Sequence, residues 1–324
     1  MTADTTTRRV GVEPTAPDDT APPTRKRRGD GRSALFYLAP SALVLVGVMG
    51  YPLYQLVQLS LYDYGQAQAS GGAPLEFLGW GNYATLLGDG RFWTVLVQTC
   101  AFAGVCVLGS LAVGIGLAVL AGRVRTLPRM LLFLAALGAW ATPAVAGSTV
   151  WLFLFDQDFG LVNEVLVGIG LHGFEGFSWT YDRYVAFGLV AGEVIWCSFP
   201  FVLVTMYAGI KAIPGEVLEA ASLDGASTWR TAREVIMPML RPLLVIATIQ
   251  SIIWDFKIFT QIYVMTDGGG IAGQNLVLNV YAYQEAFAGS NYGLGSAIGV
   301  VMTILLLIIT AIYLRAQRAT GERT

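Results

Sequence analysis

Charged side chains are scarce in this sequence of 324 residues. They make up 13% of the chain, whereas hydrophobic residues make up 55%; soluble domains typically carry about 25% charged residues. So few charges cannot cover a water-exposed surface, which excludes an ordinary soluble fold and favours lipid as the solvent. The formal net charge of −2 also excludes a general attraction to nucleic acid.

Histidine and cysteine are almost absent. The one histidine, His172, lies in the predicted external loop 156–184 with no serine, cysteine or acidic partner at a catalytic spacing. The three cysteines, Cys100, Cys106 and Cys197, lie in apolar runs and show neither a disulfide framework nor the paired spacing of a zinc site. We therefore predict that this chain holds no catalytic site, no metal and no cofactor.

Apolar residues are gathered into six long runs, each long enough to cross ~30 Å of hydrocarbon as a helix. The runs are 35–61, 94–121, 130–155, 185–210, 243–265 and 294–314. The first run is too long for the apolar segment of a signal peptide and lacks a small-residue cleavage site, so we expect it to remain as a span. The predicted fold is an all-α, polytopic membrane helix bundle of about six transmembrane helices.

Two polar tails flank the predicted membrane domain. Residues 1–33 are rich in Thr, Pro, Asp and Arg, and so polar a segment buries too little apolar surface to offset its ordering entropy. We predict a disordered N-terminal tail at 1–33, a transmembrane domain at 34–316 and a C-terminal tail at 317–324.

The basic residues indicate the orientation of the spans. The N-terminal tail holds seven Lys or Arg, residues 123–129 hold three, residues 211–241 hold four and the C-terminal end holds three. The alternate loops hold only Arg91 and Arg183. Because cytoplasmic loops carry the excess of Lys and Arg, both termini are predicted to be cytoplasmic.

The cytoplasmic segment 211–242 is longer than a connection between neighbouring helices requires. Pro214 followed by acidic residues is typical of a helix start, and Gly225 is typical of a helix end. A second amphipathic stretch, 227–237, is predicted to stop at Pro238. Two short helices joined at a glycine result; a passive hairpin that covers the bundle remains an alternative.

The residue pattern of this segment resembles the EAA loop of binding-protein-dependent ABC importer permeases. The matching positions are Glu219, Ala220, Ala221, Gly225, Val235 and Pro238. The extended form, 219–226 and onward to Pro242, is similar to the carbohydrate-uptake branch with the maltose and glycerol-phosphate permeases. Further matches are Tyr51-Pro52, 79–83, 160–163, 193–196, 266–269 and Tyr292-Gly293. One position departs: Ala232 stands where the family usually has an aromatic residue, so either Trp229 compensates or the docking surface is smaller.

The resemblance implies a division of labour. This chain would be an ABC transporter permease that supplies half of a sugar translocation pathway in a bacterial cell membrane, beside a second homologous permease subunit. A cytoplasmic ABC ATPase dimer would use ATP and Mg, and an extracytoplasmic sugar-binding protein would deliver a mono- or oligosaccharide. The residues implied to couple to the ATPase are Glu219, Ala220, Ala221, Asp224, Gly225, Trp229 and Pro238. A non-catalytic subunit agrees with the sequence, since none of its lysines closes a P-loop.

Three charged residues lie inside the predicted spans. Each charge costs at least ~2.5 kcal/mol in hydrocarbon, so Glu193, Asp255 and Lys257 are expected to face protein or water. Glu193 and Lys257 are predicted at equal depth on two consecutive spans, where opposite charges would form a structural ion pair.

Polar and aromatic residues of the fourth and fifth runs are candidates for the substrate pathway. Trp196 and Trp254 would stack on the apolar face of a sugar, while Gln250, Ser251 and Asp255 would hydrogen-bond its hydroxyls. A purely structural role for these polar groups remains an alternative. The resemblance also places sugar contacts on these two spans, but the sequence does not identify the sugar.

Two other classes of function compete with the importer. A proton- or sodium-coupled carrier would use Glu193 and Asp255 as coupling sites, but it leaves the segment 211–242 without a role. An intramembrane enzyme would need a nucleophile with a base, or paired metal ligands, and the predicted spans offer neither. The importer is therefore the favoured interpretation.

Reporter fusions test the predicted orientation. Because basic loops stay inside, fusions after Arg125 and Arg233 should be active only with a cytoplasmic reporter, and fusions after Gly72, Gly176 and Gly273 only with an external one. Whole-cell activity of paired reporters at each site is the measurement. A reversed result at two neighbouring sites would contradict the six-span arrangement.

Overall fold

The computed structural model describes residues 30–321 and divides the chain into two units, one ending at Pro52 and one beginning at Leu53. The first unit holds α1 (Asp30–Leu45), the π-helix η1 (Val46–Gly50) and the start of α2 (Tyr51–Leu59). Residues 1–29 of the predicted tail lie outside the described part of the chain. The helix α1 nevertheless begins inside the tail predicted at 1–33.

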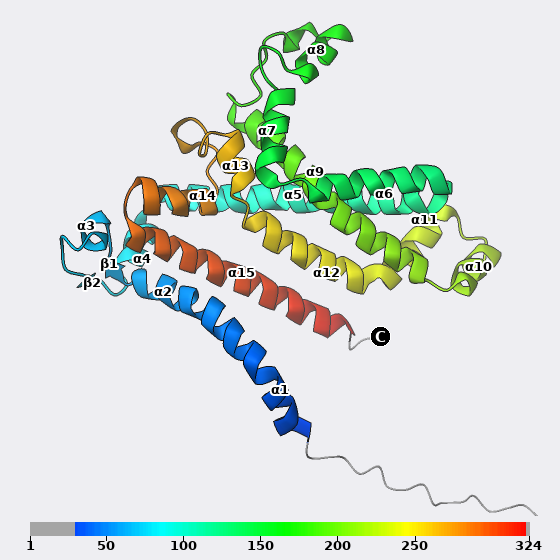
Figure 1. Ribbon diagram of the computed structural model, residues 1–324. Coiled ribbons are helices and arrows are strands. Elements are labelled where there is room, and N and C mark those ends of the chain that lie inside the picture. The colour runs from blue at the N-terminus through cyan, green and yellow to red at the C-terminus, as the bar shows by residue number, and fades with distance from the viewer. Residues whose placement is uncertain (1–29, 322–324) are drawn as a thin grey trace, which may run out of the picture. The chain divides into compact units, whose positions relative to one another are not determined.

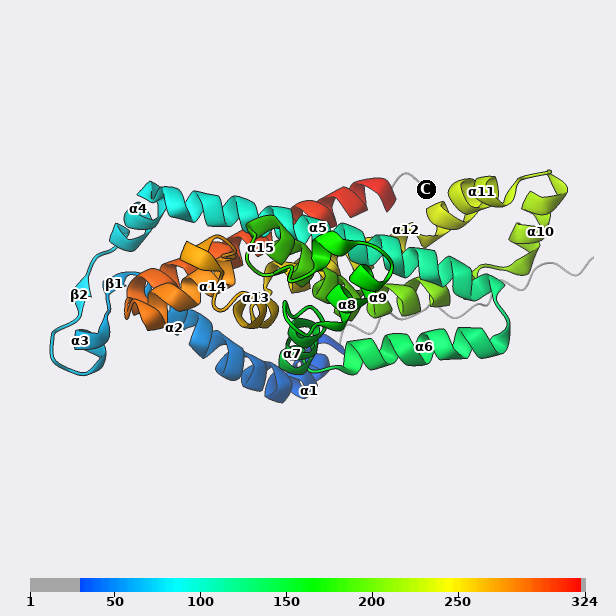
Figure 2. The same cartoon turned by 90° about the horizontal axis from the view of Figure 1, so that it is seen from above.

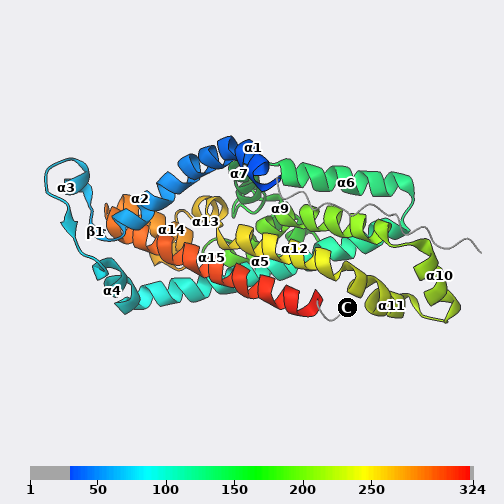
Figure 3. The ribbon, with the colours of Figure 1, turned by 90° about the horizontal axis from the view of Figure 1, so that it is seen from below.

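Long helices form the bundle of the second unit (Figure 1). They are α5 (Gly90–Arg123), α6 (Thr126–Ala141), α9 (Arg183–Ala212), α12 (Met237–Phe256) and α15 (Tyr292–Gly321). The helices α5 and α9 lie along each other, α12 packs on both, and α6 packs on α9, as the views in Figures 2 and 3 also show. The all-α polytopic bundle is confirmed. Because α15 runs to Gly321, residues 317–321 of the predicted C-terminal tail are helical.

Shorter elements connect the long helices. The α-helices are α3 (Gln66–Ala69), α4 (Gly81–Gly88), α7 (Ala144–Leu154), α8 (Leu161–Gly168), α10 (Gly215–Leu223), α11 (Thr228–Thr231), α13 (Thr260–Met265) and α14 (Leu278–Tyr283). The remaining helical turns are η2 (His172–Phe174), η3 (Ala232–Ile236), η4 (Ile271–Gly273) and η5 (Gln284–Ala288). The strands β1 (Tyr62–Asp63) and β2 (Glu76–Phe77) pair antiparallel, with Tyr62 opposite Phe77.

Two glycines let α5 and α9 approach closely. A Cβ added to Gly109 would lie 2.3 Å from Ile195, and a Cβ added to Gly114 would lie 2.5 Å from Val202. Small residues at such positions let two membrane helices pack backbone to side chain, which supplies the dispersion contacts that drive association in lipid. The α5–α9 pair is therefore the centre of the bundle.

Five described helices are long and apolar enough to cross a membrane, and a bent pair raises the number to six if it counts as one span. The five are Phe36–Leu59, Gly90–Arg123, Arg183–Ala212, Trp229–Phe256 and Tyr292–Arg315. They match five of the six predicted apolar runs.

The third predicted span, 130–155, is not one straight helix. It is the bent pair α6 and α7, which meet at 106°. The break lies at Thr142, which has extended backbone angles, before Pro143. Proline lacks a backbone N–H and disfavours a helical conformation of the residue before it, which explains the break. Figure 1 shows α7 turning away from α6.

The fifth predicted span, 243–265, is displaced and broken. Its helix ends at Phe256, and α13 begins at Thr260 after a short irregular segment. The stretch 227–237 was predicted to stop at Pro238. Instead, α12 continues at its N-terminal end through η3 into α11 without a break. In η3 the N–H of Met237 donates to the carbonyl of Ala232, five residues earlier. This wider turn precedes Pro238 and accommodates its missing donor.

The packing of Gly114 predicts a sharp difference between two glycines of α5. Gly114→Ala should destabilise the protein by about 1–3 kcal/mol, because the added methyl group overpacks the α9 contact. Gly116→Ala is the matched control, since a Cβ there meets no atom within 4 Å. Thermal midpoints of the purified protein in detergent provide the comparison, and equal midpoints would contradict the close approach of α5 and α9.

Candidate functional site

The segment between α9 and α12 folds as two helices around a left-handed glycine. The first is α10 and the second is α11, which continues into η3. Gly225 between them has φ +73°, a conformation that glycine adopts without strain. Its N–H donates to the carbonyl of Ser222, and the N–H of Ala226 donates to that of Ala221. The predicted two-helix segment with a glycine turn is therefore confirmed, although its second helix is the beginning of α12's long helix.

The segment projects beyond the end of the bundle. All three ribbon views place α10 and α11 past the ends of α9 and α12, away from α13 and α14 (Figures 1 to 3). Its largest apolar side chains are exposed, Leu223 to 89% and Trp229 to 75%. Outside the apolar spans, exposed apolar groups of this size are typical of a surface that contacts another protein.

The predicted coupling residues differ in exposure. Glu219, Ala220, Asp224, Gly225 and Pro238 are exposed, and only Ala221 is buried, at the base of α10. Ala232 is half-buried within η3 and presents no apolar knob. Beside it, the side chain of Arg230 forms an exposed ion pair of 2.9 Å with Glu234. Leu223 and Trp229 are thus the prominent apolar groups of the segment, and the sequence argument missed Leu223.

The predicted ion pair between Glu193 and Lys257 is not formed. Lys257 is exposed and lies just past the end of α12, where its carbonyl accepts a hydrogen bond from Asn279. Glu193 is 0% exposed and accepts hydrogen bonds from the Oγ of Ser148, at 3.0 Å to each carboxyl oxygen. The prediction was wrong because it treated 243–265 as one straight helix, and because Ser148 reaches Glu193 only where the third span bends.

The other pathway candidates lie on different surfaces. Ser251 and Asp255 share one face of α12, as predicted, and both are 2% exposed. The Oδ2 atom of Asp255 is buried without a hydrogen-bond partner. Gln250 is half-buried, and Trp254, 37% exposed, stacks edge-on against Phe201 at 5.3 Å between ring centroids.

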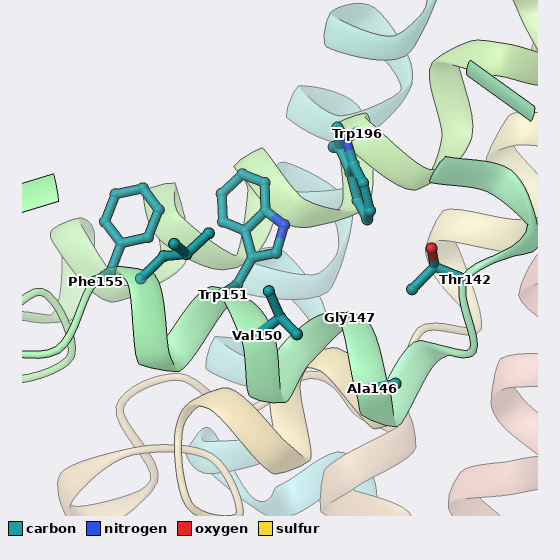
Figure 4. A pocket seen from close by; sticks show the side chains of 8 residues that line it. Thr142, Ala146, Gly147, Val150, Trp151, Phe155 and Trp196 are labelled. Carbon is teal, nitrogen blue, oxygen red and sulfur yellow. The ribbon is translucent and has the colours of Figure 1, made fainter. Parts of the chain in front are cut away.

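Trp196 lines a pocket away from the α12 candidates. The pocket has a volume of ≈400 Å³ and is lined by Thr142, Ala146, Gly147, Val150, Trp151, Leu154, Phe155 and Trp196. Figure 4 shows the ring of Trp151 projecting from α7 toward α9, which carries Trp196, with Thr142 at the break before α7. The two ring centroids are 6.3 Å apart. Trp196 therefore meets Trp151 rather than Trp254. Sequence reasoning missed Trp151 because Pro143 was not recognised as a break.

The described residues contain no group of three His, Cys, Asp or Glu side chains that could hold a metal ion. The described residues thus include an exposed two-helix segment at one end and a few buried polar groups within the bundle.

Comparison with known proteins agrees with this picture. Residues 114–324 match the family model described as the inner membrane component of binding-protein-dependent transport systems. A diacetylchitobiose uptake permease of Streptomyces coelicolor is 39% identical over 90% of this chain and 89% of its own length. A trehalose transport permease of Mycobacterium tuberculosis is 31% identical over 90% of this chain and 91% of its own. A sulfoquinovosyl glycerol transport permease of Agrobacterium fabrum is 33% identical over 90% of this chain and 92% of its own.

A solved structure shares the fold. A chain from a bacterial ABC transporter that imports the polysaccharide alginate superposes with a TM-score of 0.75 at 19% identity. The superposition covers 89% of this chain and 96% of that one.

Proposed function

Because the chain belongs to the family of inner membrane components of binding-protein-dependent transport systems, we propose that the segment 211–242 couples it to a separate ATPase. The chain is a multi-pass membrane permease of an ABC-type sugar importer and carries no catalytic activity of its own. It works in a complex with a binding protein and an ATPase. This chain then forms half of the translocation pathway, and a second homologous permease forms the other half.

The exposed coupling segment supports this proposal most directly. Leu223 and Trp229 extend beyond the bundle and fit an apolar recess on a partner. Glu219 is exposed on the same helix as Leu223 and is available to a basic group of the ATPase. The second helix of the segment continues without interruption into α12, which carries the pathway candidates Gln250, Ser251, Trp254 and Asp255.

The orientation follows from charge. The segment that holds α10 and α11 is rich in Arg and Lys, as are both ends of the chain, so we assign them to the cytoplasm. The elements α7, α8 and α13 then lie toward the outside, where a loaded binding protein delivers sugar. The chain is thus oriented with both termini cytoplasmic in a bacterial plasma membrane.

The substrate is proposed to be a small glycoside of about two units. Curated relatives are named for diacetylchitobiose, trehalose and sulfoquinovosyl glycerol, which share that size. The Trp254 side chain is 37% exposed and lies beside Phe201, so its ring offers an aromatic surface for the apolar face of a pyranose ring. Gln250, half-buried one turn before Trp254 on the same face of α12, supplies a polar group for hydroxyls.

Substitutions in the coupling segment test the proposed role. Glu219→Lys should abolish uptake of the labelled sugar and reduce co-purification of the ATPase, because it reverses the charge offered to the partner. Gly225→Ala should weaken both, since a left-handed conformation costs an ordinary residue about 1–2 kcal/mol. Uptake in cells and ATPase yield on an affinity-tagged permease are measured together.

Matched variants separate docking from folding. Gly225→Asn should retain most of the uptake, because asparagine tolerates the left-handed region. Gly215→Ala is the control. A Cβ added to Gly215 or to Gly225 would meet no atom within 4 Å, but only Gly225 has a positive φ. Wild-type uptake and ATPase yield for Glu219→Lys would show that the segment is only a passive hairpin.

A competition panel tests the substrate class. Uptake of a labelled disaccharide by cells that carry the complete importer should be suppressed by an excess of one or more unlabelled disaccharide-sized glycosides and little by free monosaccharides, because a two-unit ligand fills more of the site. Trp254→Ala should lower uptake more than Trp254→Phe, which keeps an aromatic face. Equal suppression by monosaccharides would contradict the proposed size.

A further inference from the structure

A buried carboxyl group joins the two helices beside the pocket. Glu193 of α9 is 0% exposed, and the Oγ of Ser148 of α7 lies 3.0 Å from each of its carboxyl oxygens. Ser148 is itself 0% exposed. A hydrogen bond to such a group, shielded from water, is worth more than one at the surface, and a buried carboxyl group without it would be strongly disfavoured.

Two glycines interlock the same helices. A Cβ on Gly147 of α7 would lie 3.0 Å from the Oε1 of Glu193, and a Cβ on Gly192 of α9 would lie 3.2 Å from the ring of Trp151. Each helix therefore has a glycine where the other places a large side chain. Gly192 and Glu193 are adjacent on α9, whereas Gly147 and Trp151 are four residues, or about one turn, apart on α7. The contact is reciprocal rather than a chance approach.

The interlocked contact belongs to the small interface between α7 and α9. The helix α7 departs from α6 at 106° and packs more extensively on α13, which follows the break after α12, than on α9. Thr149, the next hydroxyl on α7, is exposed and bonds only within its own helix, to the carbonyl of Val145. Of these two neighbouring hydroxyls, only that of Ser148 crosses to α9.

We propose that Ser148 and Glu193 are positioning residues of the transport pathway. Their hydrogen bond, the α7–α9 clasp, holds α7 against α9 and keeps Trp151 beside Trp196. Gly147 and Gly192 provide the close approach that the clasp requires. The inference goes beyond the proposed function, because it assigns a role to the bent third span that depends neither on the ATPase contact nor on the sugar carried.

The distance between α7 and α9 is the direct test. Spin labels are placed at Val145→Cys and Val204→Cys, both exposed positions, in the complete importer in lipid nanodiscs. The natural cysteines are first removed by Cys100→Ser, Cys106→Ala and Cys197→Ala. The clasp predicts one narrow distance distribution for this background.

Loss of either partner should release α7. Ser148→Ala and Glu193→Leu are each expected to raise the population of displaced α7 about tenfold or more, and to lower sugar uptake at equal membrane abundance. The double variant should resemble Glu193→Leu, because Ser148 has no carboxyl group left to bond once Glu193 is replaced. Glu193→Gln keeps an acceptor oxygen for Ser148 and should restore the narrow distribution and most of the uptake.

Three further variants test whether the displacement is specific to the Ser148–Glu193 hydrogen bond. Thr149→Ala removes a neighbouring hydroxyl and should change neither distance nor uptake. Lys257→Gln should likewise have no effect on the distance, since Lys257 does not contact Glu193. Where Glu193→Leu fails to assemble, Gly147→Ala takes its place, because its added Cβ crowds the Oε1 of Glu193.

The results distinguish the clasp from a general structural role. Unchanged distances in Ser148→Ala, or a shift in Glu193→Leu that Ser148→Ala does not share, would overturn the proposal. So would a Glu193→Gln variant as displaced as Glu193→Leu. Because the distances are measured without transport, failure of the clasp leaves the proposed coupling function untouched.

Discussion

The close approach of α5 and α9 is the contact on which the rest of the bundle depends. Lipid gives two helices no hydrophobic reason to associate, so dispersion contacts between tightly fitted surfaces must supply the attraction. Gly109 and Gly114 provide that fit by admitting Ile195 and Val202. The helix α12 packs on this pair and α6 packs on α9, and both clusters of buried apolar residues include side chains from α9. The same device recurs on a smaller scale between Gly147 and Glu193.

Two of the spans are interrupted where they pack beside α9. The third span bends at Thr142, and the fifth long helix ends at Phe256 before α13. Non-helical backbone within a membrane protein is tolerated where protein or a polar cavity satisfies its groups. Asn279 does so for the carbonyl of Lys257. The two breaks bring α7 and α13 together, so the irregular parts support each other while the straight helices carry the core.

Hydropathy and residue pattern were sufficient for the class of fold and for the two-helix form of the segment 211–242. Long apolar runs predict spans directly, and Gly225 predicts its turn because few other residues adopt a positive φ without strain. The lengths of the apolar runs do not predict the helix breaks, since 130–155 is apolar on both sides of Pro143. The partner of Glu193 was missed for the same reason. Straight helices place Lys257 at the depth of Glu193, whereas the bend before α7 brings Ser148 to Glu193 instead.

The uninterrupted helix from Trp229 to Phe256 has a mechanical consequence. Its 28 residues make a rod of ~42 Å at 1.5 Å per residue. One end carries an exposed tryptophan and the other carries Asp255 and Trp254. A tilt imposed on Trp229 therefore reaches the far end with no loop to absorb it. The hydrogen-bond ladder of this rod is interrupted at the π-turn η3 and at Pro242. The stiffness of these two places sets how much of a displacement at the Trp229 end becomes motion at the other end.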